Sequence, residues 1–119
     1  MKNYLAVYLG NEASHKASGW DDLSEADRKK REQEGIQAWG KWVQDHQDAI
    51  VDIGAPLGKT LRASKVGIES VRNNLTGYTV VRAASQEAAA KMFEGHPHFM
   101  IFPGASIEIM DCLPIPGNG

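Results

Sequence analysis

The stretch Ser24–Ile53, with the sequence SEADRKKREQEGIQAWGKWVQDHQDAIVDI, decides the fold of this chain. Residues at steps of three and four along it form one largely apolar helical face: Ile36, Trp39, Val43, His46 and Ile50. Ser24 is a residue type that caps helix N-termini, so we expect the helix to span about residues 25–47. The period then shortens to that of a strand over residues 49–53. A helix with one apolar face packs on a sheet, and the pattern therefore predicts strands on both sides of it in the sequence.

Length and composition bound the kind of protein. The 119 residues are expected to form a single domain over residues 1–119, large enough for one hydrophobic core. The net charge of −2 favours neither a nucleic-acid partner nor a membrane surface, and no apolar run is long enough to span a bilayer. Cys112 is the single cysteine, which rules out an internal disulfide and is typical of a reducing cytoplasm. The sequence thus predicts a cytoplasmic protein without nucleic-acid or membrane partners.

Further elements follow from the patterns elsewhere. Alternating apolar residues predict strands over residues 3–9, 76–83 and 105–113. Ser85 caps an alanine-rich helix over residues 86–94, and Cys112 is expected to be buried and unreactive in the last strand. Three connections remain: a polar segment over residues 10–22, an irregular or β-hairpin segment over residues 59–73, and an aromatic loop over residues 95–104. The order β-α-β-β-α-β predicts an α+β, ferredoxin-like subunit with both helices on one face of the sheet.

The first strand predicts a surface that another molecule must cover. Its side chains alternate between two apolar sets, one with Leu5, Val7 and Leu9 and the other with Tyr4, Ala6 and Tyr8. We expect Tyr4 and Tyr8 to lie on the sheet face opposite the helices, where water would otherwise meet a large apolar patch. The sequence therefore predicts a homodimer through the sheet faces, which forms a dimeric α/β barrel.

Two short motifs are better explained by structure than by ligand binding. The segment Gly54–Thr60 is similar to a phosphate-binding loop, but it has three residues between its glycines where that loop has four. The basic residues 28–31 have carboxylates at helical spacing, as on a solvated helix surface. Neither segment therefore predicts a nucleotide or nucleic-acid site.

Several short segments resemble the YCII-related group of dimeric α/β-barrel proteins, which includes the DGPF-type proteins. They are residues 2–8 (KNYLAVY), 54–58 (GAPLG), 78–81 (YTVV), 85–89 (SQEAA), 95–97 (GHP), Gly104 and residues 107–109 (IEI). Together they span most of the chain in the order and spacing of that group. The resemblance implies a ferredoxin-like subunit that pairs with a second copy through its sheet, in agreement with the residue patterns.

The catalytic His–Asp pair proposed for YCII-type members is absent here. The resemblance places its histidine on the first helix, but no histidine lies between Lys16 and Asp45. It places its aspartate before the proline that follows the second helix, and that position holds His96. Residues 70–77 also lack the Asp-Gly-Pro-Phe segment. No catalytic role is therefore carried over from that group.

One edge of the predicted sheet gathers the residues that can do chemistry. In this topology the ends of the first two strands, the start of the long helix and the start of the last strand share that edge. The expected ligand-binding residues are Tyr8, Asn11, Trp20, Asp52, Lys59, Phe99 and Phe102. His96 and His98 are the candidate catalytic bases, because an exposed imidazole titrates near neutral pH. The alternative is that both histidines are ordinary side chains of a loop.

The resulting hypothesis is a cleft at the sheet edge that binds a small aromatic or apolar organic molecule. His96 and His98 lack a third ligand at metal-binding spacing, so we expect no metal and no cofactor. Cofactor-free acid/base catalysis is the chemistry that such a site supports. The alternative function is a non-catalytic interaction or regulatory module that acts as a dimer. An open cleft lined by His96, His98 and Tyr8 favours the first hypothesis, and a cleft filled by Phe99, Met100 and Phe102 favours the second.

Overall fold

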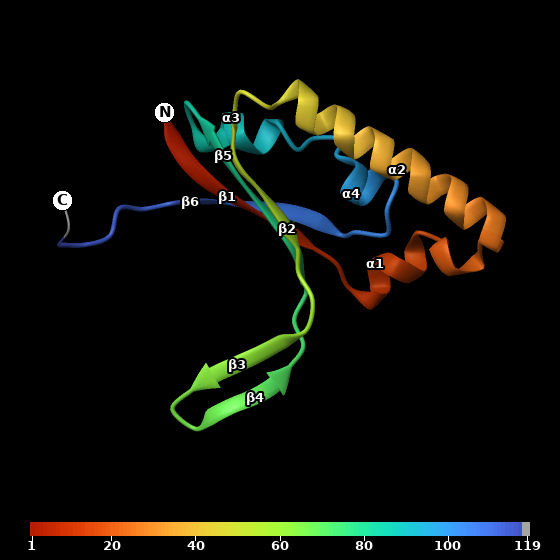
Figure 1. Ribbon diagram of the computed structural model, residues 1–119, viewed down its shortest axis with the longest axis horizontal. Coiled ribbons are helices and arrows are strands. Elements are labelled where there is room, and N and C mark those ends of the chain that lie inside the picture. Colours follow the sequence, from red (N-terminus) through yellow and green to blue (C-terminus); the bar gives the residue numbers. More distant parts are fainter. Residues whose placement is uncertain (118–119) are drawn as a thin grey trace.

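A computed structural model describes residues 1–117 and places four strands in a central antiparallel sheet (Figure 1). These strands are β1 (Lys2–Leu9), β2 (Ile50–Pro56), β5 (Leu75–Ala83) and β6 (Ser106–Asp111). They lie in the order β2–β5–β1–β6, and every neighbouring pair is antiparallel. This order confirms the predicted α+β class and is consistent with a ferredoxin-like arrangement.

The two predicted helices lie on one side of this sheet and supply its cover. They are α2 (Glu25–Asp45), the long helix in Figure 1, and α3 (Gln86–Lys91). The side chains of Ser24 and Ser85 each accept a hydrogen bond from an amide in the first turn, so both predicted N-caps are confirmed. Within residues 1–117 no helix has the apolar length that crossing a membrane requires.

Two segments for which the sequence predicts irregular structure contain short helices. These are α1 (Glu12–Ala17), the 3₁₀ turn Trp20–Asp22 and α4 (Pro97–Met100). The side chains of Asn11 and Ser14 form a reciprocal capping box at the start of α1. Pro97 occupies the first turn of α4, where a missing amide proton costs nothing. Local capping therefore forms helices too short to show an apolar period in the sequence.

A separate hairpin projects from the end of the central sheet (Figure 1). Its strands are β3 (Thr60–Ser64) and β4 (Gly67–Val71). The sequence leaves this segment open between an irregular excursion and a hairpin, and the structure shows the hairpin. Its turn places Gly67 at a φ of 111°, a conformation that favours glycine.

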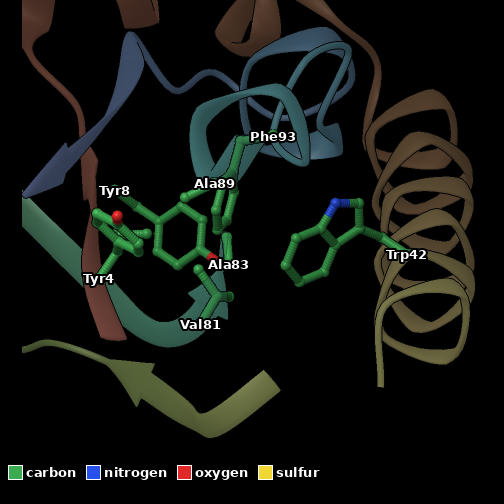
Figure 2. Packing of buried hydrophobic residues seen from close by; sticks show 8 residues of the cluster. Tyr4, Tyr8, Trp42, Val81, Ala83, Ala89 and Phe93 are labelled. Atoms are coloured by element: carbon green, nitrogen blue, oxygen red, sulfur yellow. The ribbon is translucent and has the colours of Figure 1, made fainter. Parts of the chain in front are cut away.

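The core lies between the sheet and the helices, and it contains the side of β1 that the sequence prediction places on the opposite face. Tyr4 and Tyr8 are 3% exposed, and Ala6 is 0% exposed. Figure 2 shows both tyrosines in one cluster with Trp42 and Phe93. The predicted assignment of the two faces is therefore wrong. Both alternating sets are apolar, so the alternation alone does not say which set meets the helices.

The opposite side of the sheet, which we call the open sheet face, is also apolar. Leu5 is paired with Val80 and Met110, and Val7 is paired with Tyr78 and Glu108. Residues directly opposite each other share a face, so these six side chains lie together, and all of them but Glu108 are apolar or aromatic. Met110 is 42% exposed. This open sheet face is therefore mainly apolar, with Glu108 beside Val7, and it is the side of the sheet that α2 and α3 leave uncovered.

The last strand is shorter than predicted. β6 ends at Asp111, so Cys112 lies beyond the strand and is exposed. The prediction of a buried cysteine is therefore wrong. Pro114, two residues further on, has no amide proton to extend a hydrogen-bonded ladder.

Candidate functional site

A cleft of about 930 Å³ lies between α2 and the β2–β5 side of the sheet. Its helix wall consists of Ile36, Trp39, Gly40 and Val43. Its sheet wall consists of residues 53–56 of β2 and residues 76–79 of β5. The remaining lining residues come from β1, α1, α4 and the segments beside them: Tyr8, Gly10, Asn11, His15, His98, Phe102, Pro103 and Gly104. The walls are therefore mainly aliphatic and aromatic, with few polar atoms.

Glycines shape both walls of the cleft. A Cβ atom at Gly40 would meet nothing within 4 Å, so α2 leaves open space here. Ile36, one turn earlier on the same face of α2, is 59% exposed. On the sheet side, Gly54 has a φ of 74°, and a Cβ there would overlap the carbonyl oxygen of Tyr78. Only glycine permits this close approach between the backbones of β2 and β5.

Tyr8 and Thr79 form the main polar group at the base of the cleft. Their hydroxyl oxygens lie 2.7 Å apart. The Thr79 hydroxyl donates to the carbonyl oxygen of Ile53 over 2.9 Å, so its single proton is already used. Tyr8 must then be the donor to Thr79, and the lone pairs of the Tyr8 oxygen remain free to accept. Burial raises the pKa of the Tyr8 phenol, although the Thr79 contact opposes this, so the phenol is neutral near pH 7.

His98 lines the cleft from α4, but it is only 7% exposed, which contradicts the prediction of an exposed imidazole. Its tautomer follows from its hydrogen bond. Its Nε2 lies 2.8 Å from the carbonyl oxygen of Leu9, which can only accept, so Nε2 carries a proton. Burial lowers the pKa of His98, while hydrogen bonds to the backbone of Leu9 and Ser106 act in the opposite direction. The imidazole is therefore neutral near pH 7, and its lone pair is on Nδ1. The centre of its ring lies 5.3 Å from that of Tyr8, and the two ring planes are tilted by 57°.

His96 does not lie in the cleft, which contradicts the prediction of an exposed base. It is fully buried, with its ring 4.5 Å from Trp39 and 4.8 Å from Trp42. Its Nδ1 accepts the amide proton of His98 over 3.0 Å and so caps α4. Nε2 must carry the ring proton, and it has no hydrogen-bond partner within residues 1–117. Burial first, and then His98 and His46, lowers the pKa of His96 to about 3.

The structure brings together only part of the predicted binding set. Tyr8, Asn11, His98 and Phe102 line the cleft. Five other predicted residues lie outside it: Trp20, Asp52, Lys59, His96 and Phe99. The ring of Trp20 lies 5.9 Å from that of Phe102. Asp52 is exposed and accepts a hydrogen bond from the Gly54 amide. The predicted edge thus includes too many residues, because a position at the end of a strand does not by itself say which way the side chain points.

Phe99 and Met100 do not fill the cleft, which bears on the prediction that a filled cleft would favour the interaction module. Phe99 lines a separate hollow of about 310 Å³ beside α3 and β6. Met100 is 60% exposed. Phe102 does reach the cleft, where it forms a wall against Trp39 at 6.1 Å and packs over Gly35. The cleft is therefore open.

Sequence reasoning missed the polar base and the helix wall of the site. Thr79 is 2% exposed, and a hydroxyl at such a position needs a buried partner. That need was the available signal, because Thr79 interrupts an otherwise apolar run in β5. Trp39 and Val43 belong to the apolar stripe of α2, which usually signals core packing. Nothing in that stripe shows that part of it lines an open cleft and does not pack on the sheet.

The cleft is electrically neutral. None of its lining residues is a lysine, arginine, aspartate or glutamate. His15, at the margin, lies 3.0 Å from the exposed carboxylate of Asp21. Across residues 1–117, no three His, Cys, Asp or Glu side chains are grouped so that they could hold a metal ion. The polar side chains open to a ligand are therefore hydroxyl and imidazole groups and the amide of Asn11.

Comparison with known proteins places the fold and not the family. No protein-family model matches this chain, and no curated protein sequence matches it. A solved structure with a similar fold is 5-chloro-2-hydroxyhydroquinone dehydrochlorinase from Burkholderia phenoliruptrix AC1100, in complex with 2,5-dihydroxybenzoquinone. The TM-score is 0.53 at 14% identity, and the match covers 98% of this chain and 99% of that one. The chain therefore shares the fold of that enzyme over nearly its whole length.

Proposed function

We propose that this protein binds a small, neutral, planar organic molecule in the cleft between α2 and the β2–β5 edge. The observation that carries this proposal is the Tyr8 oxygen, a buried acceptor whose own proton is committed to Thr79, at the base of an apolar cleft of about 930 Å³. Clefts of several hundred cubic ångströms with few polar groups are typical of small-molecule sites. A ligand with one hydroxyl group would pair that hydroxyl with Tyr8 and place its ring between the walls.

The side chains of the walls support an aromatic ring in particular. Trp39 and Phe102 face the same space from α2 and from the segment after α4. Aromatic rings pack well against such groups in offset or edge-to-face geometry. The related fold of a dehydrochlorinase solved with a quinone supports the same ligand class. The absence of lysine and arginine among the lining residues disfavours a carboxylate or phosphate ligand.

His98 is the group that we propose for cofactor-free acid/base catalysis at this site. It lines the cleft, its imidazole is neutral near pH 7, and the Leu9 carbonyl holds its proton on Nε2. Nδ1 is then the nitrogen that can take a proton from a ligand hydroxyl. His96 is not part of this proposal, because its Nδ1 caps α4 and its ring is fully buried. The resemblance to the YCII-related group is compatible with such a site and supplies no catalytic residue for it.

We also propose a homodimer, because this chain exposes too much surface for a compact monomer. Its accessible surface is 8613 Å² at a mass of 13.0 kDa. Monomers of this mass expose roughly 6,300 Å², so the excess is about 2,300 Å² per chain. Permanent dimers bury about 2,000 to 5,000 Å² over both partners, which matches an excess of this size. The open sheet face is the surface that we propose pairs, in place of the face of Tyr4 and Tyr8. A dimer without a ligand is the form that a non-catalytic interaction module would take.

Calorimetric titration with two matched probes tests the binding proposal. 2-Naphthol carries a neutral hydroxyl group, and 2-naphthoate carries a carboxylate on the same ring system. We expect 2-naphthol to bind once per chain and at least tenfold more tightly than 2-naphthoate. The expected amide shifts on 2-naphthol binding, measured by NMR, fall on α2 near Trp39 and on β5 near Thr79. Equal affinity for both probes, or shifts confined to other surfaces, would leave the interaction-module hypothesis in its place.

A further inference from the structure

The β3–β4 hairpin is amphipathic across its two faces. Leu61 lies opposite Ser70, and Ala63 lies opposite Ile68, so these four side chains share one face. The other face carries Arg62 and Glu69, whose side chains form an exposed ion pair at 3.4 Å. We call the face of Leu61, Ala63 and Ile68 the apolar arm face.

This apolar arm face is bare. Leu61 is 70% exposed and Ile68 is 75% exposed, and Val66 at the turn is 83% exposed. Figure 1 shows the hairpin standing clear of the central sheet and of the helices. A two-stranded hairpin without further cover is marginally stable in water. An apolar arm face on such a hairpin therefore needs a surface to pack on.

The shape of the whole chain indicates that this surface belongs to a second copy. The radius of gyration is 16.5 Å, with extents of 55 × 42 × 18 Å. A compact domain of this length has a radius of gyration of about 13.5 Å. The projecting hairpin contributes to this extension and to the excess of exposed surface. In a closed two-fold dimer each chain offers both an arm and an apolar open sheet face, so two unpartnered apolar surfaces are covered by one assembly.

We propose that the β3–β4 hairpin is an exchanged arm, whose apolar face packs on the body of the second copy in the homodimer. The proposal rests on the homodimer inferred above and adds which element of each chain packs on the partner. The arm emerges from the ends of β2 and β5, where residues 53–56 and 76–79 form the sheet wall of the cleft. Dimer formation thereby holds the frame of the binding site, because it anchors the strands that build this wall.

Two double variants with the same new residue test the arm. Leu61→Thr with Ile68→Thr removes the apolar arm face, and Arg62→Thr with Glu69→Thr changes the polar face at unchanged net charge. Threonine is favourable in strands, so both hairpins keep their propensity. By sedimentation equilibrium we expect the first variant to raise the dimer dissociation constant at least tenfold, and the second to change it less than threefold. Equal dissociation constants for the two variants contradict the proposal.

A mixed dimer tests the location of the arm directly. A spin label is attached at Ser64→Cys in chains that also carry Cys112→Ser, and these chains are mixed with ¹⁵N-labelled chains without a spin label. The expected result is paramagnetic broadening of amides in the body of the ¹⁵N-labelled chain. Only contact between the two copies can produce it, because the spin label is on the other chain. A dimer without such broadening overturns the arm and leaves the dimer standing. A wild-type monomer at micromolar concentration overturns both, and the 2-naphthol titration remains an independent test of the cleft.

Discussion

The hydroxyl of Tyr8 donates to the Thr79 hydroxyl over 2.7 Å, because the proton of Thr79 is already held by the carbonyl oxygen of Ile53. This relay runs from β1 to β5 and on to β2, so it joins three strands at the base of the cleft. It also leaves the lone pairs of the Tyr8 oxygen free to accept a hydrogen bond. The same contact thus stabilises the fold and gives the apolar cleft a directional polar group.

Tyr8→Phe tests this group with the loss of one oxygen atom. We expect the affinity for 2-naphthol to fall about tenfold, which corresponds to about 1.4 kcal/mol for one hydrogen bond. The free energy of unfolding should fall by about 0.5–1.5 kcal/mol in urea titrations. Tyr4→Phe removes the same atom from a buried tyrosine that does not line the cleft, and 2-naphthol should bind this control as it binds wild type. An unchanged affinity in Tyr8→Phe would remove the phenol from the site.

His96 predicts how stability depends on pH. Its pKa is about 3 in the folded chain and about 6.5 when unfolded, so the unfolded chain binds the extra proton between these values. The contribution of His96 is therefore complete above pH 6.5 and is lost as the pH falls toward 3. Urea unfolding between pH 4.5 and 7.5 should show a loss of up to about 1.4 kcal/mol per pH unit from this one group.

His96→Asn separates that titration from the cap that His96 forms. Asparagine keeps an acceptor for the His98 amide and carries no titrating group, so the pH slope should become shallower. The smaller side chain also leaves space among Trp39 and Trp42, and we expect the variant to be less stable at pH 7 by about 1–3 kcal/mol. Parallel slopes in wild type and His96→Asn would contradict the assigned pKa.

Gly104→Ala tests the placement of His98. A Cβ at Gly104 would overlap the imidazole of His98, whose Nε2 is bonded to Leu9, and also the backbone carbonyl oxygen of His98. The ring must therefore move off the Leu9 carbonyl, and we expect a loss of about 1–3 kcal/mol in unfolding free energy. The ¹⁵N shifts of the His98 ring should change from those of one fixed Nε2–H tautomer toward a mixture. Gly58→Ala, where a Cβ meets nothing within 4 Å, is the control, and an unaltered His98 spectrum in Gly104→Ala would count against this geometry.

Local signals in the sequence predict the helices and strands, but they do not predict which face of the sheet packs on the helices. Ser24 and Ser85 indicate where their helices begin, because capping depends on the residue itself and on the first turn that follows it. The side of β1 that carries Tyr4 and Tyr8 was assigned wrongly because both sides of that strand are apolar. Only the packing partners, Trp42 and Phe93, decide which side is inside.

The site was readable in its residue types and only partly in its positions. Tyr8, His98 and Phe102 could be predicted because the topology brings the end of β1 and the segment before β6 together. His96 lies two residues before His98, at the N-cap of α4. Its side chain is buried and caps the helix, so it does not line the cleft. Gly40 and Gly54 shape the walls by what they lack, and a missing side chain gives no positive signal in a single sequence.

The most direct test of the central claim is to fill the cleft from α2. Gly40→Leu places a side chain in the open space of the helix wall, and its helix propensity favours folding by up to about 0.8 kcal/mol. Gln37→Leu adds the same side chain at an exposed position of α2 outside the cleft. The account predicts that Gly40→Leu is at least as stable as wild type and binds 2-naphthol at least tenfold more weakly, while Gln37→Leu binds it unchanged. A folded Gly40→Leu that binds 2-naphthol as tightly as wild type would show that the cleft is not the binding site.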